Sequence, residues 1–428
     1  MTQIVHLHEA LDGQRLWDDV QSLAAIGALE PKGIRRLALD DEDNRARLWL
    51  AEQGRSLGCQ VYFDALGNLF LRREGQDASL APLLIGSHMD SQPQAGAHDG
   101  ALGVLAGLAV LRTLQEQGIE HRRPLEVVAW TNEEGARFAP GASGSSWYVG
   151  QREYEDIVSA LDGEGVRFGD ALQACLTLLK DTGLEYRPAP FVPHAFLELH
   201  IEQGPVLEQL GKPVGVVSGI QGVNWYRIQV EGVANHAGTT PLQARRDAFD
   251  GAHELVSALK EATREQDDDD LRFTIGKFSL WPDAVNTIAQ QATFTIDMRH
   301  PRQAVLDDLD AQFHELARNQ WSGCDVTLEV TSRVAPVAFP ETLLAVLRES
   351  ADSVCKEAPE LVSGAFHDAI HLAHVCPTAM FFTPCRAGIS HHPDEHIERQ
   401  DADIAVRALA HAAETLLITR NNAHDSDH

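Results

Sequence analysis

The stretch GSHMDSQPQAGAHDG, residues 86–100, decides how the rest of the chain is interpreted. It follows the apolar run 82–85, which is typical of a short buried strand, and it precedes residues 101–114, which are small and apolar at helical spacing. His88 and Asp90 therefore fall where a strand ends, and Asp99 falls where a helix begins. Ligands of open α/β sheets bind at the carboxyl ends of the strands, and imidazole and carboxylate groups are what zinc and its neighbours select.

Each of these residues also has a more ordinary explanation. Asp99 could be the N-cap of the following helix, which is a common position for Asp. His88 could be a core histidine whose hydrogen bond is satisfied by Asp90. The stretch alone favours a metal site only modestly. The residues at the ends of the other strands decide between a metal site and these ordinary explanations.

Three further apolar strands end in side chains of the same kind. They are 125–135 with Glu133 and Glu134, 196–204 with His200, and 378–383 followed by His391 and His392. Neighbouring side chains at a strand end point in different directions, so one glutamate can bind metal while the other faces a metal-bound water. Four such strand ends at one sheet edge predict a metal site. Five ligands with one shared carboxylate are what a dinuclear hydrolase requires.

The segment HDAIH, residues 367–371, places two histidines at i and i+4, as in the HExxH motif of zinc proteases. Aspartate replaces the essential glutamate there, and in a chain with 20 histidines such a spacing arises easily. We therefore interpret it as a chance match for metal binding.

Length and charge limit the possible functions. A chain of 428 residues is long enough for two or three domains. Its net charge of −28 argues against nucleic acid and anionic membrane surfaces as partners. An acidic enzyme needs a local basic residue to accept an anionic substrate, so an arginine near the site is informative.

The six cysteines form no CxxC pair and no dense framework, which favours reduced thiols in a cytoplasmic protein. The N-terminal residues have neither the basic nor the apolar region of a signal peptide. The longest apolar run, 100–111, is too short to span a bilayer. We therefore expect a soluble cytoplasmic protein.

The hydrophobic pattern divides the chain into a catalytic domain, residues 1–212 with 328–428, and an inserted domain, residues 213–327. The insertion opens with alternating strands and continues with a helix, two strands and a second helix. The expected ranges are 244–264, 272–280, 291–299 and 302–318. Strands with helices on one face are the α+β pattern of a small two-layer domain.

Seven motifs carry a family resemblance. They are GSHMDSQP, HDGALGVLAGL, WTNEEGARF, ELHIEQGPVLE, HAGTTPLQARRDA, TFTIDMR and GISHHPDEH. Over nearly its whole length the chain resembles the hydantoinase/carbamoylase family of amidohydrolases. That family includes N-carbamoyl-L-amino acid hydrolases, allantoate amidohydrolases and β-ureidopropionases, and it is related to di-zinc aminoacylases and carboxypeptidases. The resemblance implies an α/β di-metal peptidase-like catalytic domain with a mixed, mainly parallel sheet flanked by helices. It also implies an inserted α+β lid domain through which two copies form a homodimer.

The resemblance further implies two divalent metal ions and the residues that hold them. Asp99 bridges the two ions, His88 and His200 complete one site, and Glu134 and His391 complete the other. The family motif puts the last ligand directly after Ser390, which favours His391 over His392. Zinc is the first candidate, and manganese, cobalt or nickel suit the same mixed ligand set.

Other positions match residues that act on the substrate. Glu133 corresponds to the general base, and Asp90 corresponds to a carboxylate that orients His88. His236 resembles the histidine that polarises the scissile carbonyl, reaching the metals of the partner subunit. Gln203, Asn286 and Arg299 match substrate-binding positions, with the planar fork of Arg299 holding the substrate carboxylate.

The chain departs from the family pattern in three places. Phe366 and Ala289 stand where the family usually has glycine and proline, and residues 140–143 differ from the commoner methionine-containing form. None of these changes removes a ligand or the base. The leading expectation is hydrolysis of the carbamoyl C–N bond of an N-carbamoyl-L-amino acid. Allantoate and N-acyl amino acids are the alternative substrates. A catalytically dead scaffold would have no need for Glu133 beside a ligand.

Overall fold

The computed structural model describes residues 6–188 and 190–418. The chain forms two compact units, Met1–Ser218 with Phe339–His428, and Gly219–Ala338. We call them the large unit and the inserted unit. The expected insertion, 213–327, starts and ends earlier than the observed one. The reason lies in strand pairing, because β7 (Gly215–Ile220) pairs with β14 (Thr378–Thr383) and β11 (Asp325–Val334) pairs with β8 (Gly222–Glu231).

The large unit is built on a mixed sheet with a parallel centre; of its ten strands, β12 falls wholly within the residue range of the inserted unit. Its main strand order is β12-β7-β14-β6-β3-β4-β2-β1-β5, and β13 pairs with β7. The central strands β14, β6 (Ala195–Ile201), β3 (Leu83–His88) and β4 (Leu125–Trp130) run parallel to one another. Every residue of these four strands is buried, as their unbroken apolar runs predict for strands covered on both faces. Their carboxyl ends therefore lie at one sheet edge.

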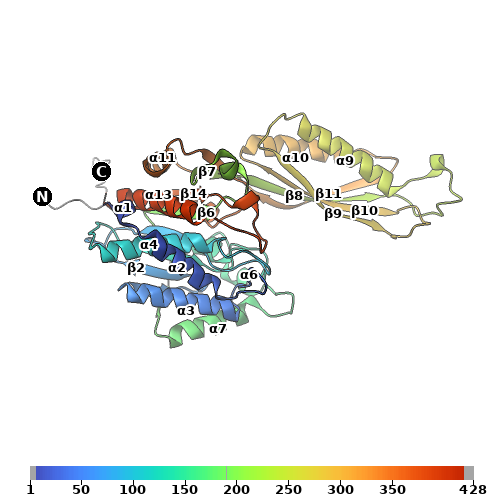
Figure 1. Cartoon of the computed structure of the whole chain (residues 1–428). Coiled ribbons are helices and arrows are strands. Elements are labelled where there is room, and N and C mark those ends of the chain that lie inside the picture. Colours follow the sequence, from blue (N-terminus) through green and yellow to red (C-terminus); the bar gives the residue numbers. More distant parts are fainter. Residues whose placement is uncertain (1–5, 189, 419–428) are drawn as a thin grey trace, which may run out of the picture. The chain divides into compact units, whose positions relative to one another are not determined.

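Helices flank this sheet (Figure 1). They are α1 (Leu7–Ala10), α2 (Gly13–Ala24), α3 (Asp41–Ser56), α4 (Ala101–Glu116), α5 (Ser143–Tyr148), α6 (Tyr154–Val158), α7 (Phe168–Asp181), α8 (Val206–Leu210), α11 (Glu341–Val354), α12 (Ala369–Leu372) and α13 (Arg399–Ile418). The outer strands are β1 (Gln60–Phe63), β2 (Leu69–Arg73), β5 (Glu185–Tyr186), β12 (Val337–Ala338) and β13 (Glu360–Ser363).

Helix α4 packs so closely on the central strands that glycine is required in it. A Cβ at Gly103 would lie 2.4 Å from the carbonyl oxygen of Leu199, and one at Gly107 would lie 2.8 Å from a methyl group of Val127. All residues of the helix from Ala101 to Leu114 are buried. This close contact fixes the N-terminus of α4, and Asp99 with it, at the edge where β3 and β6 end.

The inserted unit is a four-stranded antiparallel sheet with two helices. Its strand order is β11-β8-β10-β9, with β9 at Arg272–Trp281 and β10 at Gln291–His300. Figure 1 shows α9 (Ala248–Arg264) and α10 (Gln303–Ala317) on the same face of this sheet. Alternate residues of β10 are buried in a core with both helices. The other residues of the strands form what we call the open face, which none of the described helices of this unit covers.

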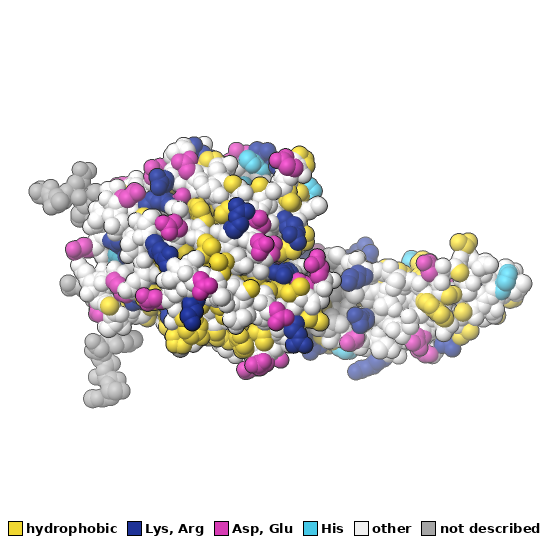
Figure 2. All heavy atoms as spheres, turned by 90° about the horizontal axis from the view of Figure 1, so that it is seen from below, with side chains coloured by type: hydrophobic (Ala, Val, Ile, Leu, Met, Phe, Trp, Pro, Cys, Tyr) yellow, Lys and Arg dark blue, Asp and Glu magenta, His cyan; other side chains and the backbone are white. Residues whose placement is uncertain are grey.

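The expected fold class is confirmed in both units: a mixed, mainly parallel sheet with flanking helices, and a separate two-layer α+β unit. Within the described ranges, no helix combines the length and the apolar character that crossing a membrane requires. Acidic and basic side chains are interspersed over the face of the large unit shown in Figure 2.

Candidate metal centre

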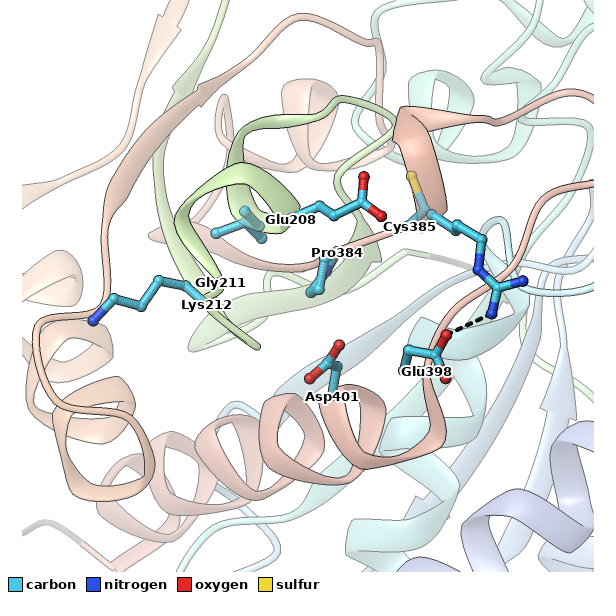
Figure 3. Close-up of a pocket in the computed structure, with 9 residues that line it drawn as sticks. Glu208, Gly211, Lys212, Pro384, Cys385, Glu398 and Asp401 are labelled. Carbon is cyan, nitrogen blue, oxygen red and sulfur yellow. Dashed lines mark hydrogen bonds and ion pairs between the residues drawn. The ribbon is translucent and has the colours of Figure 1, made fainter.

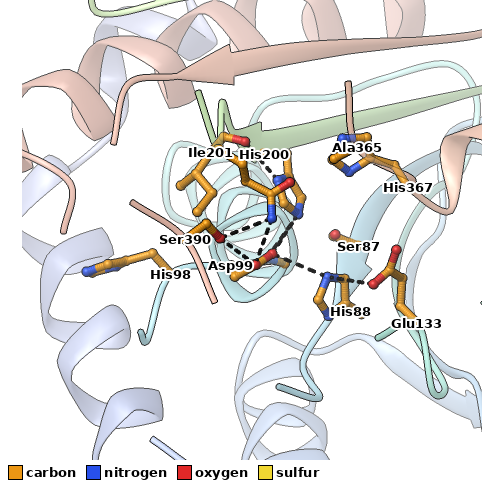
Figure 4. A network of polar contacts seen from close by, with 12 residues as sticks. Ser87, His88, His98, Asp99, Glu133, His200, Ile201, Ala365, His367 and Ser390 are labelled. Atoms are coloured by element: carbon orange, nitrogen blue, oxygen red, sulfur yellow. Dashed lines mark hydrogen bonds and ion pairs between the residues drawn. The ribbon is translucent and has the colours of Figure 1, made fainter. Parts of the chain in front are cut away.

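Asp99 lies where the side chains from four strand ends meet. One of its carboxylate oxygens, Oδ1, is 3.1 Å from Nε2 of His200 and 3.7 Å from Nε2 of His88. The other oxygen, Oδ2, is 3.3 Å from Nε2 of His391. Figure 4 shows Asp99 with His200 on one side and His88 on the other. One carboxylate thus faces three imidazoles from separate segments of the chain.

The ligand atoms form two groups that share this carboxylate. His88, Asp99 and His200 make the first group, and Asp99, Glu134 and His391 make the second, with the ligand atoms of each group within 4.8 Å of one another. The structure therefore brings together all five residues that the sequence proposes as ligands. Such a donor set suits two divalent metal ions that share one carboxylate.

The electrostatics of the site fit bound cations. Burial lowers the pKa of His88 to about 4, so its ring is neutral, the form that binds a metal. Burial and the Asp99 carboxylate raise the pKa of Glu134 to about 8. Oxygen Oε1 of Glu134 is buried and has no hydrogen-bond partner among the described residues. Carboxylates crowded in this way favour a cation between them, since a positive charge would relieve their repulsion.

Glu133 differs from Glu134 in its position. Its Oε2 lies 3.4 Å from Nε2 of His88, on the metal-facing side of that ring, and Glu133 belongs to neither of the two ligand groups. Burial, with Asp368 and Glu134 nearby, raises its pKa well above the usual range. Asn132, at a positive φ of 56°, makes the turn that separates the two glutamates from β4. A carboxylate whose pKa is strongly perturbed beside the ligand groups makes Glu133 a candidate functional residue.

Asp90 contacts His88 and also the turn that carries the two glutamates. Nδ1 of His88 lies 3.0 Å from the backbone oxygen of Asp90 and 3.8 Å from its carboxylate. The carboxylate instead accepts hydrogen bonds of 3.2 Å from the backbone N–H groups of Glu133 and Glu134. In this structure the hydrogen bond of His88 is with the carbonyl of Asp90, while the turn at residues 132–134 offers two N–H donors to the carboxylate; the expected role of that carboxylate in orienting His88 stays a prediction.

Three residues support the shared carboxylate. Nε2 of Gln203 donates to Oδ2 of Asp99 at 2.9 Å, and the hydroxyl of Ser390 donates to the same oxygen at 3.0 Å. The carboxylate of Glu395 accepts the backbone N–H groups of His98 and Asp99. Gln203, expected to bind substrate, thus contacts Asp99 in this structure. Ser390 and Glu395 have no assigned role from sequence, although both lie in the motif that carries His391.

Sequence reasoning also missed His367. Its ring packs edge-on against that of His200 at 4.4 Å, and its ligand atoms lie within reach of His200 and Glu198. His371, the other histidine of HDAIH, instead hydrogen-bonds Gln151. The two histidines therefore do not form one HExxH-like pair, and the proximity of His367 to the site comes from the fold. Phe366 is half-buried directly before His367.

The remaining predicted residues lie in the inserted unit. His236 is exposed in the loop after β8 and forms an isolated bridge with Thr287, and the adjacent Ala237 N–H donates to the carbonyl of Asn286. Nδ1 of His236 accepts the N–H of Gly238 at 3.0 Å. In the neutral ring Nε2 then carries the proton, so this nitrogen is a hydrogen-bond donor.

Arg299 lies near the opposite end of β10. Its Nε and Nη2 each donate to one oxygen of Asp297 at 2.8 Å, which orients the guanidinium on the open face. Arg299 lies eight residue steps along the extended strand from Gln291, at the His236 end, a distance of about 27 Å. The structure thus brings His236 and Asn286 together and keeps Arg299 far from both.

A separate cavity of about 210 Å³ lies beside the short turn Arg386–Gly388 (Figure 3). Its lining includes Glu208, Lys212 and Cys385, and an ion pair joins Arg386 to Glu398. None of the predicted site residues lines it.

Residues 84–415 match Peptidase family M20/M25/M40. With that match and several relatives above 30% identity over almost the whole chain, the protein belongs to Peptidase family M20/M25/M40. The expected resemblance to the hydantoinase/carbamoylase family is confirmed by its relatives and structural neighbours.

Two sequence relatives and one solved structure illustrate the similarity. The chain is 35% identical over 409 residues to an N-carbamoyl-L-amino acid amidohydrolase of Geobacillus stearothermophilus, covering 94% of this chain and 98% of that protein. It is 34% identical over 401 residues to an allantoate amidohydrolase of Bacillus subtilis, covering 92% and 95%. The crystal structure of a hydantoinase/carbamoylase family amidase from Burkholderia multivorans matches with a TM-score of 0.88 at 38% identity, covering 96% and 99%.

Proposed function

We propose that this protein is a metal-dependent amidohydrolase that cleaves the carbamoyl C–N bond of an N-carbamoyl-L-amino acid. The products are ammonia, carbon dioxide and the free amino acid. One observation carries the proposal: the Asp99 carboxylate is shared by two buried ligand groups, and Glu133 stands beside them without belonging to either. Relatives named for this reaction support the choice of substrate.

His88, His200, Glu134 and His391 would hold two divalent ions with Asp99 between them. When bound, the ions supply Lewis-acid polarisation of the carbonyl and lower the pKa of a water molecule. Glu133 takes the proton of that water and delivers it to the leaving nitrogen. Zinc is the first candidate for this nitrogen and oxygen ligand set, with manganese, cobalt and nickel as alternatives.

The inserted unit supplies the contacts to the rest of the substrate. Arg299 holds the carboxylate through its guanidinium, which Asp297 orients by accepting hydrogen bonds from Nε and Nη2 at 2.8 Å. His236 donates from Nε2 to the carbonyl oxygen, with Asn286 beside it. These roles give the inserted unit the function of a lid.

The active site is completed across a homodimer. A small ureido acid spans only a fraction of the 27 Å or so along β10 between Gln291, at the His236 end, and Arg299, so one inserted unit cannot bring both His236 and Arg299 to one substrate. We infer that the two residues act at different sites of the homodimer, and that His236 acts at the metals of the partner subunit.

The surface along β9 fits a second copy of the chain. This strand is an edge of the small sheet, with one side of its backbone unpaired by any described strand. Phe249, Phe278 and Trp281 lie on or beside it and are each about half exposed. Exposed aromatic side chains at a sheet edge favour a symmetric pairing of edges.

Allantoate is the second candidate substrate, because a relative 34% identical to this chain is named an allantoate amidohydrolase. It also carries a carboxylate and ureido groups, so the same contacts serve it. An N-acyl amino acid is a third possibility, since it differs from the first only in the group attached to the carbonyl.

Ammonia release from the carbamoyl and ureido substrates, and amino acid release from the N-acetyl compounds, test these candidates in the metal-loaded enzyme. A panel of N-carbamoyl-L-amino acids, allantoate and N-acetyl amino acids should give the highest kcat/KM with an N-carbamoyl-L-amino acid. Higher activity with allantoate would replace the first candidate by the second, and amino acid release from the acetyl compounds alone would favour the third. The expected cytoplasmic location stays a prediction, in agreement with six unpaired cysteines.

A further inference from the structure

Glu395 lies between the two segments of the large unit that carry Asp99 and His391. Its side chain is almost completely buried, with 3% of the residue exposed. Oε1 of Glu395 accepts hydrogen bonds from the backbone N–H groups of His98 at 3.0 Å and Asp99 at 3.2 Å. These partners are 297 and 296 residues away in the sequence. One buried carboxylate oxygen thus holds the backbone of Asp99 from the segment that carries His391.

The other carboxylate oxygen of Glu395 connects to the same two segments through Ser390. Oε2 lies 3.2 Å from the hydroxyl oxygen of Ser390, and that hydroxyl lies 3.0 Å from Oδ2 of Asp99. Figure 4 shows Ser390 beside Asp99. His391 follows Ser390 directly, and its Nε2 lies 3.3 Å from the same Oδ2. Glu395 therefore fixes Asp99 through its backbone and, by way of Ser390, through its side chain.

The backbone around Glu395 is shaped to admit this side chain. A Cβ at Gly96 would lie 2.3 Å from Cβ of Glu395, so a larger residue at that position would collide with it. Gly33 packs in a similar way, since a Cβ there would lie 3.0 Å from Cβ of Pro393. Glycines from two separate segments thus leave room for residues 393–395. The contact is a closely packed one, in addition to its hydrogen bonds.

The histidines of the first ligand group are held by other contacts. Nδ1 of His88 lies 3.0 Å from the backbone oxygen of Asp90, and Nδ1 of His200 lies 2.9 Å from that of Ile201. Both rings belong to buried strands, β3 and β6, so the strands themselves fix their positions. His391, in contrast, is half exposed in a loop and has a positive φ of 55°. Its position depends on contacts that regular secondary structure does not supply.

We propose that Glu395 is a positioning residue that holds Asp99 and His391 at the spacing the second metal ion requires, the ion assigned to Asp99, Glu134 and His391. The inference rests on the proposed function, which places two ions in this centre. Residues that orient metal ligands contribute roughly 10- to 100-fold to metal affinity. Without the carboxylate, the buried N–H groups of His98 and Asp99 lose their acceptor, which is costly enough to displace their segment. The ion at the two strand histidines should be affected less.

The test is a metal titration of the full chain, which needs no substrate. Metal-free wild type and variants are dialysed against zinc buffers of graded free concentration, and the bound zinc per chain is measured. We expect Glu395→Ala to bind the first ion like the wild type and the second only at roughly 10- to 100-fold higher free zinc. Glu395→Gln should bind both ions within about threefold of the wild type, because its amide oxygen can accept the same two N–H groups.

Glu398→Ala is the matched control. It removes a carboxylate from the same part of the chain, but one that is exposed and pairs with Arg386. Both ions should bind to this variant as they do to the wild type. A second-ion affinity that falls as far in Glu398→Ala as in Glu395→Ala would overturn the inference, because the effect would then come from removing charge.

Two results with Glu395→Ala contradict the positioning role: two ions bound with wild-type affinity, or both ions weakened equally. A folded Glu395→Gln protein that loses the second ion contradicts it as well. Circular dichroism identifies a variant that does not fold. If Glu395→Ala fails to fold, Glu395→Asp decides, because its shorter side chain cannot reach both segments and should weaken the second ion alone.

The titration also separates this inference from the proposed function. A wild type that binds two ions but hydrolyses none of the proposed substrates would contradict the proposed function, and the role of Glu395 would still be decided by its variants. A wild type that binds fewer than two ions would overturn both.

Discussion

The two units of this protein hold their functional side chains in opposite ways. In the large unit His88, Asp99 and His200 are each less than 10% exposed, and their ligand atoms converge within 4.8 Å. In the inserted unit His236 is exposed, and it lies at the other end of the sheet from Arg299. Buried, preorganised groups are suited to chemistry, because their electrostatic effects are strong where water is excluded. Exposed groups on separate ends of a sheet are suited to binding a substrate that a second subunit helps to enclose.

This contrast predicts that changes at the metal centre affect turnover and that changes at Arg299 affect recognition, while His236, which acts on the carbonyl, also affects turnover. The largest effect should come from Glu133→Gln, which keeps the shape of the side chain but removes its basicity. We expect kcat to fall by roughly 10²-fold or more while the metal content stays near normal. The measurement is the metal content of the purified variant, determined together with its kcat. A variant that loses metal along with activity would show Glu133 to be a ligand, and a fully active one would overturn the mechanism.

The second prediction asks whether the inserted unit serves its own chain or the partner. Glu133→Gln and His236→Ala should each be nearly inactive alone. Unfolded together and reassembled, their heterodimers should recover up to about half of the wild-type activity, since one of the two sites then has both intact residues. Each variant reassembled with itself is the control. Heterodimers without recovered activity would mean that His236 acts within its own chain.

A smaller effect is expected from Arg299→Lys, which keeps the positive charge but loses the planar fork. KM for carboxylate substrates should rise roughly tenfold with little change in kcat. Replacing the substrate carboxylate by an amide should then harm the wild type far more than the variant. Equal losses of activity in both enzymes would show that Arg299 is a structural residue, whose ion pair with Asp297 stabilises the sheet.

The smallest effect on activity should come from removing an ion-pair partner of a buried carboxylate away from the site. The same change should lower the stability measurably. Arg187 forms hydrogen bonds to both oxygens of Glu126, a carboxylate that is fully buried and also binds Arg72. Arg187→Met should lower the free energy of unfolding by about 2 kcal/mol, because Glu126 keeps only one partner. The matched change Arg246→Met, which removes an exposed pair with Asp325, should shift the denaturation midpoint much less. Urea unfolding of both variants, with kcat measured in parallel, checks the difference; similar shifts would contradict it.

The chain's sequence by itself determines the metal-binding face of the large unit. Parallel strands that are buried on both faces need unbroken apolar runs, so the ends of β3, β4, β6 and β14 can be recognised from residues alone. Because parallel strands end at one edge, the ligands that follow them, from His88 to His391, have to converge. This convergence of the ligands does not depend on the order of the strands in the sheet.

Tertiary structure alone decided the finer contacts. Whether Asp90 orients His88 through its carbonyl or its carboxylate depends on the turn at residues 132–134, whose N–H groups come from a different strand. The position of His367 beside His200 depends on the packing of segments that are 167 residues apart in sequence, which no local pattern records. The pairing of Trp225 with Asp297 depends on the register of β8 against β10. A local pattern sets which face a side chain takes, and only the pairing of distant segments sets its neighbours.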